Sequence, residues 1–368
     1  MRKPRVLFYY PQHFNRTAQG TNPFLDKLLE TCDKYGVSYR VYEEPDGGTD
    51  KHRNPKARKA DIFFWFVWFV RNVVKIFSRK DFYHREKYVA KIVNILTLGY
   101  FKVPVYVTFS GSMFHLFASL NPAAKVYDAQ HGVLMKNHRT FFDDNDVLRE
   151  HYYKSNLHWM MWGDGYTDLF SKGEDVLKGR VHTIGYPIAK NDDIVVTEDK
   201  VALVSLQYTH DWDMPFLEIQ KRLLDDTLSQ FIGTGYKVLV RHHPRYNNVI
   251  PIDDVLGKYD FVSLTSMPFN QLIGKVSLQV TYNSTTAFEY AQYGIPSVFM
   301  SNDDFRHQDN MMYREFAYPL FENMSVQESL EYLQNNDVKQ TMKNWYELFY
   351  SSFDEEAFLK LVNELDCV

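Results

Sequence analysis

The chain has 368 residues, of which 45% are hydrophobic and 24% charged, a composition typical of a globular protein. This length exceeds the size at which a single hydrophobic core keeps growing, so it predicts two domains. A formal net charge of −4 argues against non-specific nucleic-acid binding.

The cysteines and the N-terminus indicate where the protein works. Cys32 and Cys367 lie outside any CxxC or Cys/His cluster, which argues against a zinc site and a disulfide framework. The opening MRKPRVLFYYPQHF passes from basic residues directly into a short strand-like segment, without the apolar core and cleavage site of a signal peptide. We therefore expect a cytoplasmic protein.

Residues 58–80, RKADIFFWFVWFVRNVVKIFSRK, form the most apolar stretch of the chain. Its unbroken apolar core, residues 62–70, is too short to span a bilayer. Trp and Phe between basic flanks are typical of a helix that lies in the lipid headgroup layer. A helix buried between a sheet and solvent explains the same pattern, so both alternatives stay open.

The first half of the chain alternates between strand-like and helix-like segments. A buried strand, a polar loop, a helix and a second strand open the chain, and this rhythm predicts a doubly wound α/β sheet. The predicted strands are 4–10, 37–43, 103–110, 124–132 and 157–165, and the predicted helices are 22–36, 58–80 and 165–173.

The rhythm breaks at 179–193 and restarts at residue 200 with the strand KVALVSLQ. Further strands are predicted at 236–244, 259–266 and 295–300. A helix is predicted between the strand that begins at residue 200 and the strand at 236–244. We expect two facing Rossmann-like domains, 1–188 and 189–350, with a ligand cleft between the carboxyl ends of their strands. Residues 351–368 predict a helix that crosses back to the first domain.

The strand at 124–132 ends in the first polar cluster, with Asp128, Gln130 and His131 in front of a glycine. A histidine there is well placed to be a general base, because its ordinary pKa is close to working pH, and Asp128 would orient or replace it. A histidine satisfied within the core is the alternative. Lys136 and His138 follow and, with Gln130, are candidate acceptor contacts.

An acidic run, Asp143-Asp144-Asn145-Asp146, comes shortly after this cluster. Such a run can hold a metal-bound nucleotide. However, it has no second carboxylate group at a ligand spacing. We therefore expect a solvated loop and no metal site.

The second cluster, Arg241-His242-His243-Pro244-Arg245, ends the strand YKVLV. Pro244 disfavours the helical region for His243, which turns the imidazole toward the loop. Guanidinium groups match phosphate oxygens bidentately, so Arg241 and His243 predict a phosphate site. A basic surface turn is the alternative.

The third cluster is TYNSTTAFEYAQYGIP at 281–296, where a strand gives way to a helix. Asn283, Ser284, Thr285 and Thr286 cap the first turn of a helix or hold an anion there. Glu289, a single carboxylate in an apolar stretch, is expected to be buried and to accept hydrogen bonds from a ribose, or to be an ordinary helix charge.

With these clusters in chain order, the sequence resembles the GT-B superfamily of nucleotide-sugar glycosyltransferases. VRHHPRY is similar to the HP motif of bacterial sialyltransferases, capsule Kdo transferases and CDP-glycerol glycerophosphotransferases. YNSTTAFEYAQYGIPSVF is similar to a segment of the Kdo transferases, and QHGVLMKNH to the His-Gly-Thr segment of the glycerophosphotransferases. Tyr282 and Asn283 depart from the Asp and Tyr of the glycerophosphotransferases, so the donor stays open.

The resemblance implies a metal-independent transferase without a cofactor, which takes a CMP-linked or other nucleotide-linked sugar as substrate. Arg241, His243 and residues 283–286 with Glu289 would hold the donor, and His131 would activate a glycan or lipid-linked acceptor. His243 would also stabilise the leaving phosphate. A CDP-polyol phosphotransferase, a nucleotide-sugar epimerase and a non-catalytic glycan-binding protein are the alternatives.

Overall fold

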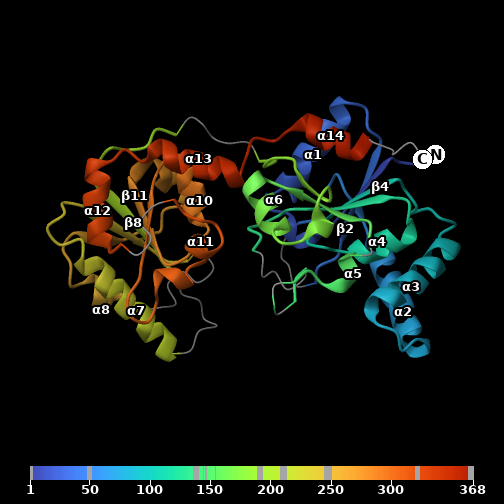
Figure 1. Cartoon of the computed structure of the whole chain (residues 1–368), viewed down its shortest axis with the longest axis horizontal. Coiled ribbons are helices and arrows are strands. Elements are labelled where there is room, and N and C mark those ends of the chain that lie inside the picture. The colour runs from blue at the N-terminus through green and yellow to red at the C-terminus, as the bar shows by residue number, and fades with distance from the viewer. Residues whose placement is uncertain are drawn as a thin grey trace. The chain divides into compact units, whose positions relative to one another are not determined.

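The structure is a computed structural model that describes residues 3–47, 52–135, 141–143, 145, 147–153, 155–188, 194–207, 214–243, 251–319 and 324–363. The chain divides into two compact units (Figure 1). Unit 1 comprises Met1–Ala189 and Phe349–Val368, and unit 2 comprises Lys190–Leu348. In the described part of the chain, no helix has the length and apolar content needed to cross a bilayer.

Unit 1 is built on a seven-stranded sheet with the order β3-β2-β1-β4-β5-β6-β7, in which every neighbouring pair is parallel. Its central strands are continuous apolar runs such as VLFYYP and VYVTF, because parallel strands are covered on both faces. The strands are β1 (Val6–Pro11), β2 (Tyr39–Glu44), β3 (Arg58–Lys59), β4 (Val105–Phe109), β5 (Lys125–Ala129), β6 (Leu157–Met161) and β7 (Val181–Thr183).

Helices connect and cover these strands. Asn22 caps the first of them by accepting from the backbone N–H groups of Phe24 and Leu25. The helices of the first part of unit 1 are α1 (Pro23–Lys34), α2 (Asp61–Phe77), α3 (Phe82–Leu96), α4 (Phe114–Leu120), α5 (Glu150–Tyr153) and α6 (Asp164–Ser171). No element was expected from the sequence at residues 82–96, where the structure has α3, which packs against both α2 and α4.

The last helix, α14 (Glu355–Asn363), lies on unit 1, next to α1. The Tyr127 hydroxyl donates to the Leu361 carbonyl at 3.2 Å, and Arg5 Nε donates to the Val362 carbonyl at 2.7 Å. Just before α14, Ser352 bridges to Tyr186. Gly185 makes this approach possible: its φ is +80°, and a Cβ there would meet the Ser352 carbonyl oxygen at 2.2 Å.

Unit 2 is built on a second parallel sheet, of five strands in the order β10-β9-β8-β11-β12. Val204 belongs to the core on one face of this sheet and Leu203 to the core on the other, because successive strand residues point to opposite faces. The strands are β8 (Val201–Ser205), β9 (Lys237–Arg241), β10 (Val262–Leu264), β11 (Leu278–Thr281) and β12 (Ser297–Phe299).

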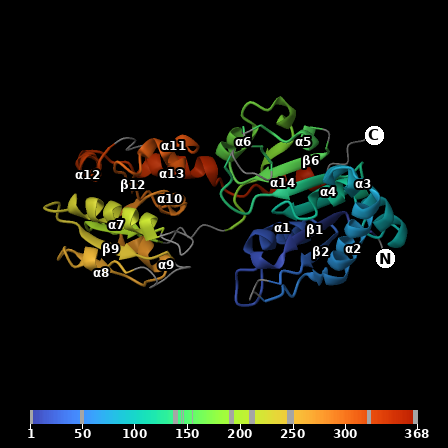
Figure 2. The ribbon, with the colours of Figure 1, turned by 90° about the horizontal axis from the view of Figure 1, so that it is seen from below.

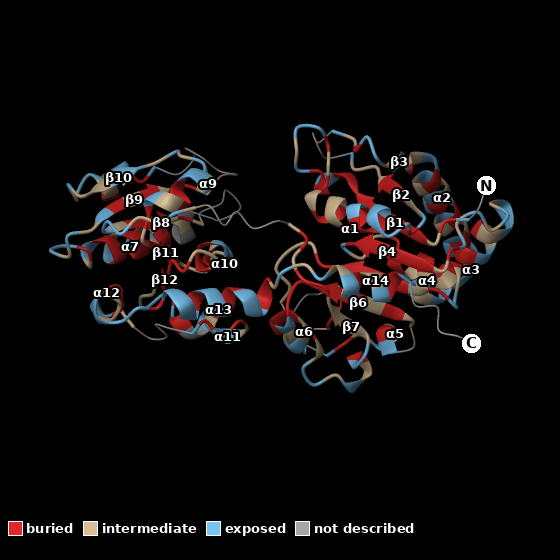
Figure 3. Cartoon of the chain, turned by 90° about the horizontal axis from the view of Figure 1, so that it is seen from above, coloured by how far each residue is buried: buried red, intermediate tan, exposed pale blue. Residues whose placement is uncertain are grey.

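The described residues of unit 2 form seven α-helices, the last of which ends at the first residue of the returning chain, and several are only one turn long. They are α7 (Met214–Ser229), α8 (Asp253–Leu256), α9 (Phe269–Leu272), α10 (Thr286–Ala291), α11 (Met311–Arg314), α12 (Val326–Asn335) and α13 (Lys339–Phe349). Figure 2 shows helices on both sides of the sheet in this unit, and in Figure 3 the strands of each unit are largely buried. The predicted α/β class, with a Rossmann-like parallel sheet in each half, is confirmed.

Candidate functional site

A narrow pocket opens where β4, β5 and β6 end in unit 1. In a parallel sheet all carboxyl ends meet at one edge, so the residues that follow these strands gather there. The pocket measures about 50 Å³, enough for a few water molecules. Ser110, Asp128, Gln130, His131 and Trp159 are among its lining residues.

Asp128 is the titratable group best placed in this pocket. Its side chain is buried, and one oxygen, Oδ1, accepts from the Gly111 N–H at 2.9 Å and from the Thr108 hydroxyl at 3.1 Å. Burial disfavours the charged carboxylate and raises its pKa to about 7, against the opposing effect of these two hydrogen bonds. Asp128 can therefore exchange a proton near neutral pH.

The loop after β4 adopts an uncommon backbone conformation around this carboxylate. Ser110, Gly111 and Met113 have φ values of 60°, 65° and 53°. For Ser110 and Met113, which are not glycines, this left-handed conformation costs on the order of 1 kcal/mol each. The turn directs the Gly111 N–H at Asp128 and places Ser110 on the pocket wall. Strained backbone of this kind is frequent at functional sites.

His131 lines the same pocket and is half-buried, with the Phe14 ring edge-on at 4.7 Å between ring centroids. Gln130 lies beside it, but its amide is used by the protein: Nε2 donates to the Gly132 carbonyl at 2.9 Å, and Oε1 accepts from the Trp162 N–H at 2.9 Å. Gln130 therefore ties the end of β5 to the end of β6. Lys136 and His138 lie outside the described residues.

A second histidine at this edge was missed in the sequence. His13 follows β1, and its Nδ1 lies 2.6 Å from Asp46 Oδ2. Its ring packs on Phe14 at 4.3 Å, so the imidazoles of His13 and His131 both contact Phe14. The position of His13 directly after a strand was available from sequence. Its partner Asp46 was not, because only the parallel pairing of β1 with β2 brings it there.

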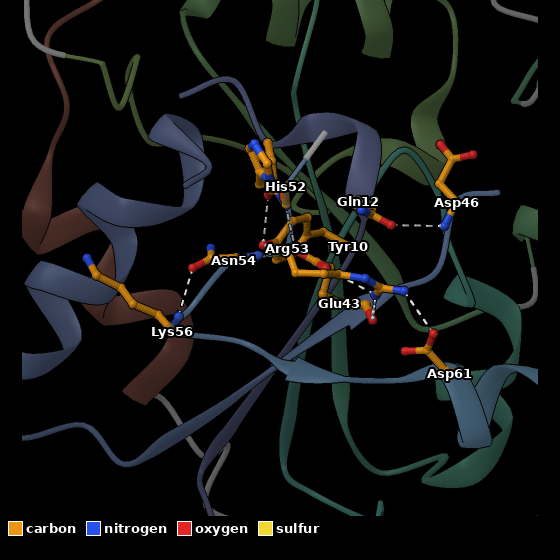
Figure 4. A network of polar contacts seen from close by, with 10 residues as sticks. Tyr10, Gln12, Glu43, Asp46, His52, Arg53, Asn54, Lys56 and Asp61 are labelled. Atoms are coloured by element: carbon orange, nitrogen blue, oxygen red, sulfur yellow. Dashed lines mark hydrogen bonds and ion pairs between the residues drawn. The ribbon is translucent and has the colours of Figure 1, made fainter. Parts of the chain in front are cut away.

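A buried network supports the same edge (Figure 4). Glu43 on β2 accepts from Arg53 at 3.1 Å, from the Asn54 N–H at 2.8 Å and from the Tyr10 hydroxyl at 3.1 Å. Arg53 also donates to Asp61, the first residue of α2, at 2.8 Å. This network fixes the loop before α2 against β1 and β2.

Of the acidic run, Asp143 and Asn145 are among the described residues, and they lie in a turn. The Asp143 carboxylate accepts from the N–H groups of Asn145 at 2.8 Å and Val147 at 3.1 Å. This agrees with the expected loop. No group of three or more His, Cys, Asp or Glu side chains suited to a metal ion occurs among the described residues.

In unit 2, two of the predicted clusters leave the sheet at the same edge. Arg241 on β9 and Thr281 on β11 both pair with Ser205 of the intervening strand β8. Strands two positions apart are separated by about 10 Å, so the loops with His243 and with Asn283 begin about that far from one another. The two clusters thus share one edge.

The guanidinium of Arg241 is held by the protein through one nitrogen. Its Nε donates to the Met267 carbonyl at 3.1 Å, while its terminal nitrogens have no hydrogen-bond partner among the described residues. The next residue, His242, is buried, and burial lowers its pKa. His243 is half-buried. Pro244 and Arg245 lie outside the described residues.

The hydroxyl cluster is largely engaged in local bonds. Ser284 Oγ accepts from the Thr286 N–H at 3.3 Å and from the Thr286 hydroxyl at 2.9 Å. The Thr286 hydroxyl also accepts from the buried Gln279 amide. The backbone N–H of Asn283 donates to Gln207 at 2.8 Å, which joins the loops after β8 and β11. These contacts form a local turn before α10, whose N-cap residue Thr285 makes no side-chain capping bond.

The helix expected to start within residues 284–286 begins at Thr286, and because α10 has only six residues, the dipole available at its start is small. One expectation for this segment is wrong. Glu289 was expected to be buried, but it is exposed, because the buried face of α10 is formed by Ala287, Phe288, Tyr290 and Ala291. Thr285 is exposed as well.

Comparison with known proteins identifies the fold. No protein-family model matches the chain, and no curated protein matches its sequence. The solved structures similar to it include UDP-GlcNAc 2-epimerase from Neisseria meningitidis bound to UDP-GlcNAc, with a TM-score of 0.55 and 11% identity over 97% of this chain and 99% of that one.

Two further solved structures are similar over nearly the whole chain. The H444N variant of the wall teichoic acid polymerase TagF has a TM-score of 0.52 and 14% identity over 98% of this chain and 88% of that one. A glycosyltransferase from Rickettsia africae has a TM-score of 0.50 and 10% identity over 99% and 100%. The chain thus has the GT-B fold, as the sequence motifs predicted. At these identities the likeness shows the fold alone.

Proposed function

We propose that the protein is a GT-B glycosyltransferase that uses a nucleotide-sugar donor to extend a surface polysaccharide or a lipid-linked glycan. The observation that carries the proposal is the pocket of unit 1, where the buried Asp128, whose pKa is about 7, lies with His131 at the carboxyl edge of a parallel sheet. Deprotonating an acceptor hydroxyl needs a base that titrates near the working pH.

Unit 2 would hold the donor. The terminal guanidinium nitrogens of Arg241 have no partner within the described part of the chain, and His243 follows two residues later, so this strand end can contact a diphosphate. Asn283 and Thr285, rather than the internally bonded Ser284 and Thr286, would then supply the side-chain contacts from the neighbouring loop. Such preorganised donors stabilise the charge that develops on the leaving phosphate without a metal.

Unit 1 would supply the base and hold the acceptor. Asp128 and His131 line one pocket, and either can take the hydroxyl proton. The His13–Asp46 pair at the same edge is a second candidate base, because a carboxylate fixes its imidazole at 2.6 Å. We also propose that the protein works at the cytoplasmic face of a membrane, with residues 58–80 as the contact.

The other reactions found on this fold are distinguished by their products. Structures similar to this chain include an epimerase, which changes the sugar of its donor, and a teichoic acid polymerase. A transferase of the proposed kind forms a glycosidic bond, a polyol phosphotransferase forms a phosphodiester, and an epimerase needs no acceptor. A glycan-binding protein without activity would bind no nucleotide.

The test is a nucleotide screen followed by product analysis. CMP, CDP, UDP and GDP are added to the full chain, and thermal unfolding is followed. A nucleotide at 100 times its Kd stabilises the folded chain by about 2.7 kcal/mol. His243→Ala should abolish this shift, whereas Lys237→Ala, at the opposite end of the same strand, should keep it. The protein is then incubated with a sugar donor that carries the stabilising nucleotide. Mass spectrometry of the product identifies the bond formed.

Two results would overturn the proposal. The first is a chain that no nucleotide stabilises. The second is a His243→Ala variant that binds and turns over the donor as the unsubstituted protein does.

A further inference from the structure

The outer face of α2 is apolar where a surface helix is normally polar. Phe63, Val67, Val70 and Val74 form its buried stripe, as expected for a helix packed on a core. On the opposite side a second stripe of large apolar residues is exposed: Ile62, Trp65, Trp68, Phe69 and Ile76, with exposed fractions of 88%, 58%, 53%, 60% and 78%. An apolar patch of this kind usually marks an interaction surface.

The adjacent helix α3 extends this surface. Figures 1 and 2 show α2 and α3 side by side on one flank of unit 1, and the two helices are in contact. Tyr88, Ile95 and Leu96 are exposed on α3, and Phe77 is 84% exposed where α2 ends. We call this set of exposed apolar side chains on α2 and α3 the α2–α3 face. All of it belongs to unit 1.

The α2–α3 face carries basic charge on an otherwise acidic protein. Residues 61–98 contain seven Lys and Arg and three Asp and Glu, whereas the whole chain has a net charge of −4. Two of the three carboxylates already have partners within this segment. Glu86 is buried and pairs with Arg71 at 2.7 Å, and Asp81 caps the start of α3. Lys75, Arg79, Lys87 and Lys91 are exposed and form no ion pair with the described residues.

A groove crosses this face between the two helices. Its walls are apolar, with Val73, Val74, Phe77 and Ile92, and its volume is about 650 Å³. Arg79, Lys80 and Tyr88 line the same groove. Lys80 Nζ donates to the Tyr88 hydroxyl at 3.2 Å, which holds the ammonium group at the groove. An apolar channel beside two cations suits an amphiphile with an acyl chain and an anionic head.

We propose that the α2–α3 face docks on an anionic lipid bilayer and that the groove seats one anionic phospholipid. Arg79 and Lys80 would contact its phosphate, and its chain would lie along Val73, Phe77 and Ile92. The aromatic stripe of α2 would enter the headgroup layer, where Trp and Phe are favoured, and the remaining cations would face the lipid surface. This develops the membrane contact included in the proposed function, but it does not depend on the reaction.

Charge favours a membrane over a second copy of the chain as the occupant. A two-fold dimer through the α2–α3 face would bring the same surface of both copies together. Lys75, Arg79, Lys87 and Lys91 of each copy would then approach one another without matching carboxylates. An anionic bilayer instead neutralises these charges while it takes up the apolar side chains.

The docking test is co-sedimentation of the full chain with vesicles of phosphatidylcholine alone or with 30 mol% phosphatidylglycerol. We expect binding to the anionic vesicles only, weakened by salt. Arg79→Glu/Lys80→Glu should lower the partition coefficient by about tenfold or more. Trp65→Gln/Phe69→Gln should lower it as well. The charge-matched control Lys237→Glu/Lys343→Glu, at exposed positions of unit 2, should bind as the unsubstituted protein does.

Two further measurements locate the contact. Brominated phosphatidylglycerol should quench part of the tryptophan fluorescence, and Trp65→Phe/Trp68→Phe should remove that quenching. Short-chain phosphatidylglycerol below its micelle concentration should raise the melting temperature of the unsubstituted chain but not of Arg79→Glu/Lys80→Glu. Inorganic phosphate and short-chain phosphatidylcholine should not raise the melting temperature of either protein.

The proposal is overturned if the unsubstituted chain does not bind anionic vesicles, or if the control pair loses as much binding as Arg79→Glu/Lys80→Glu. It is also overturned by a dimer in light scattering that Trp65→Gln/Phe69→Gln dissociates while no vesicle is bound. None of these measurements requires turnover. A negative result would therefore overturn the docking proposal without bearing on the proposed reaction. Transfer to a water-soluble acceptor should be unchanged in Arg79→Glu/Lys80→Glu.

Discussion

The backbone N–H of Gly111 lies 2.9 Å from the buried Asp128 carboxylate, in a loop whose neighbouring residue Ser110 is also in the left-handed region. One hydrogen bond thus links an uncommon backbone turn to the titratable group of the pocket. The donor favours the ionised carboxylate, and burial opposes it. The balance sets a proton equilibrium close to neutral pH.

This balance predicts that Asp128→Asn stabilises the protein at alkaline pH. The folded-state pKa, about 7, is above the unfolded value of about 3.9, so ionisation of Asp128 costs stability as pH rises between these values. The amide keeps an acceptor for Gly111 and Thr108 and removes the charge. We expect a gain of up to about 4 kcal/mol in the free energy of unfolding at pH 8, measured by urea denaturation.

The same variant should gain nothing at pH 4, where Asp128 is protonated in the folded chain. A gain that is independent of pH would show that the carboxylate does not titrate as the structure indicates. Asp128→Asn should also have lost most of its transferase activity, so stability and activity move in opposite directions.

The pH dependence of turnover should follow the same group. If ionised Asp128 takes the acceptor proton, kcat/KM rises with pH through about 7 and then levels off. Thr108→Val removes a donor to the carboxylate while keeping the side-chain volume. It should move the rising limb to higher pH. A profile that Thr108→Val leaves in place would argue against Asp128 as the titrating base.

The two histidines on Phe14 can be separated by kinetics. We expect His131→Ala to lower kcat by about 10² to 10⁴, the usual contribution of a general base, and His13→Ala or Asp46→Asn to lower it by less than about tenfold. Stopped assays at saturating donor measure this. A larger loss of kcat in His13→Ala than in His131→Ala would instead assign the base to the His13–Asp46 pair.

Gly185 should be far less tolerant of substitution than another left-handed glycine of unit 1. Gly185→Ala places a methyl group against the Ser352 backbone, whereas nothing lies within 4 Å of a Cβ at Gly179, whose φ is +74°. We expect Gly179→Ala to cost about 1 kcal/mol of stability and Gly185→Ala more than about 3 kcal/mol. Equal losses would show that the return of the chain before α14 is not tightly packed at Gly185.

The buried network at the same sheet edge should be sensitive to a change of charge. Glu43→Gln keeps the shape of the side chain but removes the buried carboxylate that faces Arg53, which keeps only its partly exposed partner Asp61. We expect a loss of about 3 kcal/mol in the free energy of unfolding. The exposed pair of Lys178 with Asp175 is the control, and Asp175→Asn should have no measurable effect. A small effect of Glu43→Gln would mean that water replaces the lost contacts.

Sequence patterns predicted the alternation of apolar strands and helices, the new start of that alternation near residue 200, and the positions of Asp128, Arg241 and Ser284 at the ends of strands. Each of these follows from residues close together in the chain, through hydrophobic period and turn composition. The predicted strands were expected to be parallel, and the carboxyl ends of parallel strands lie at one edge of the sheet. Polar residues that follow different strands were therefore expected to share that edge.

Features that depend on which distant segments pack together could be found only in the three-dimensional structure. The burial that raises the pKa of Asp128, the pairing of His13 with Asp46 and the hydrogen bond from the Trp162 N–H to Gln130 all involve segments far apart in the sequence. The same holds for α2, where the sequence left a buried helix and a membrane-surface helix open. Only packing against unit 1 shows that one apolar stripe is covered and the other is exposed.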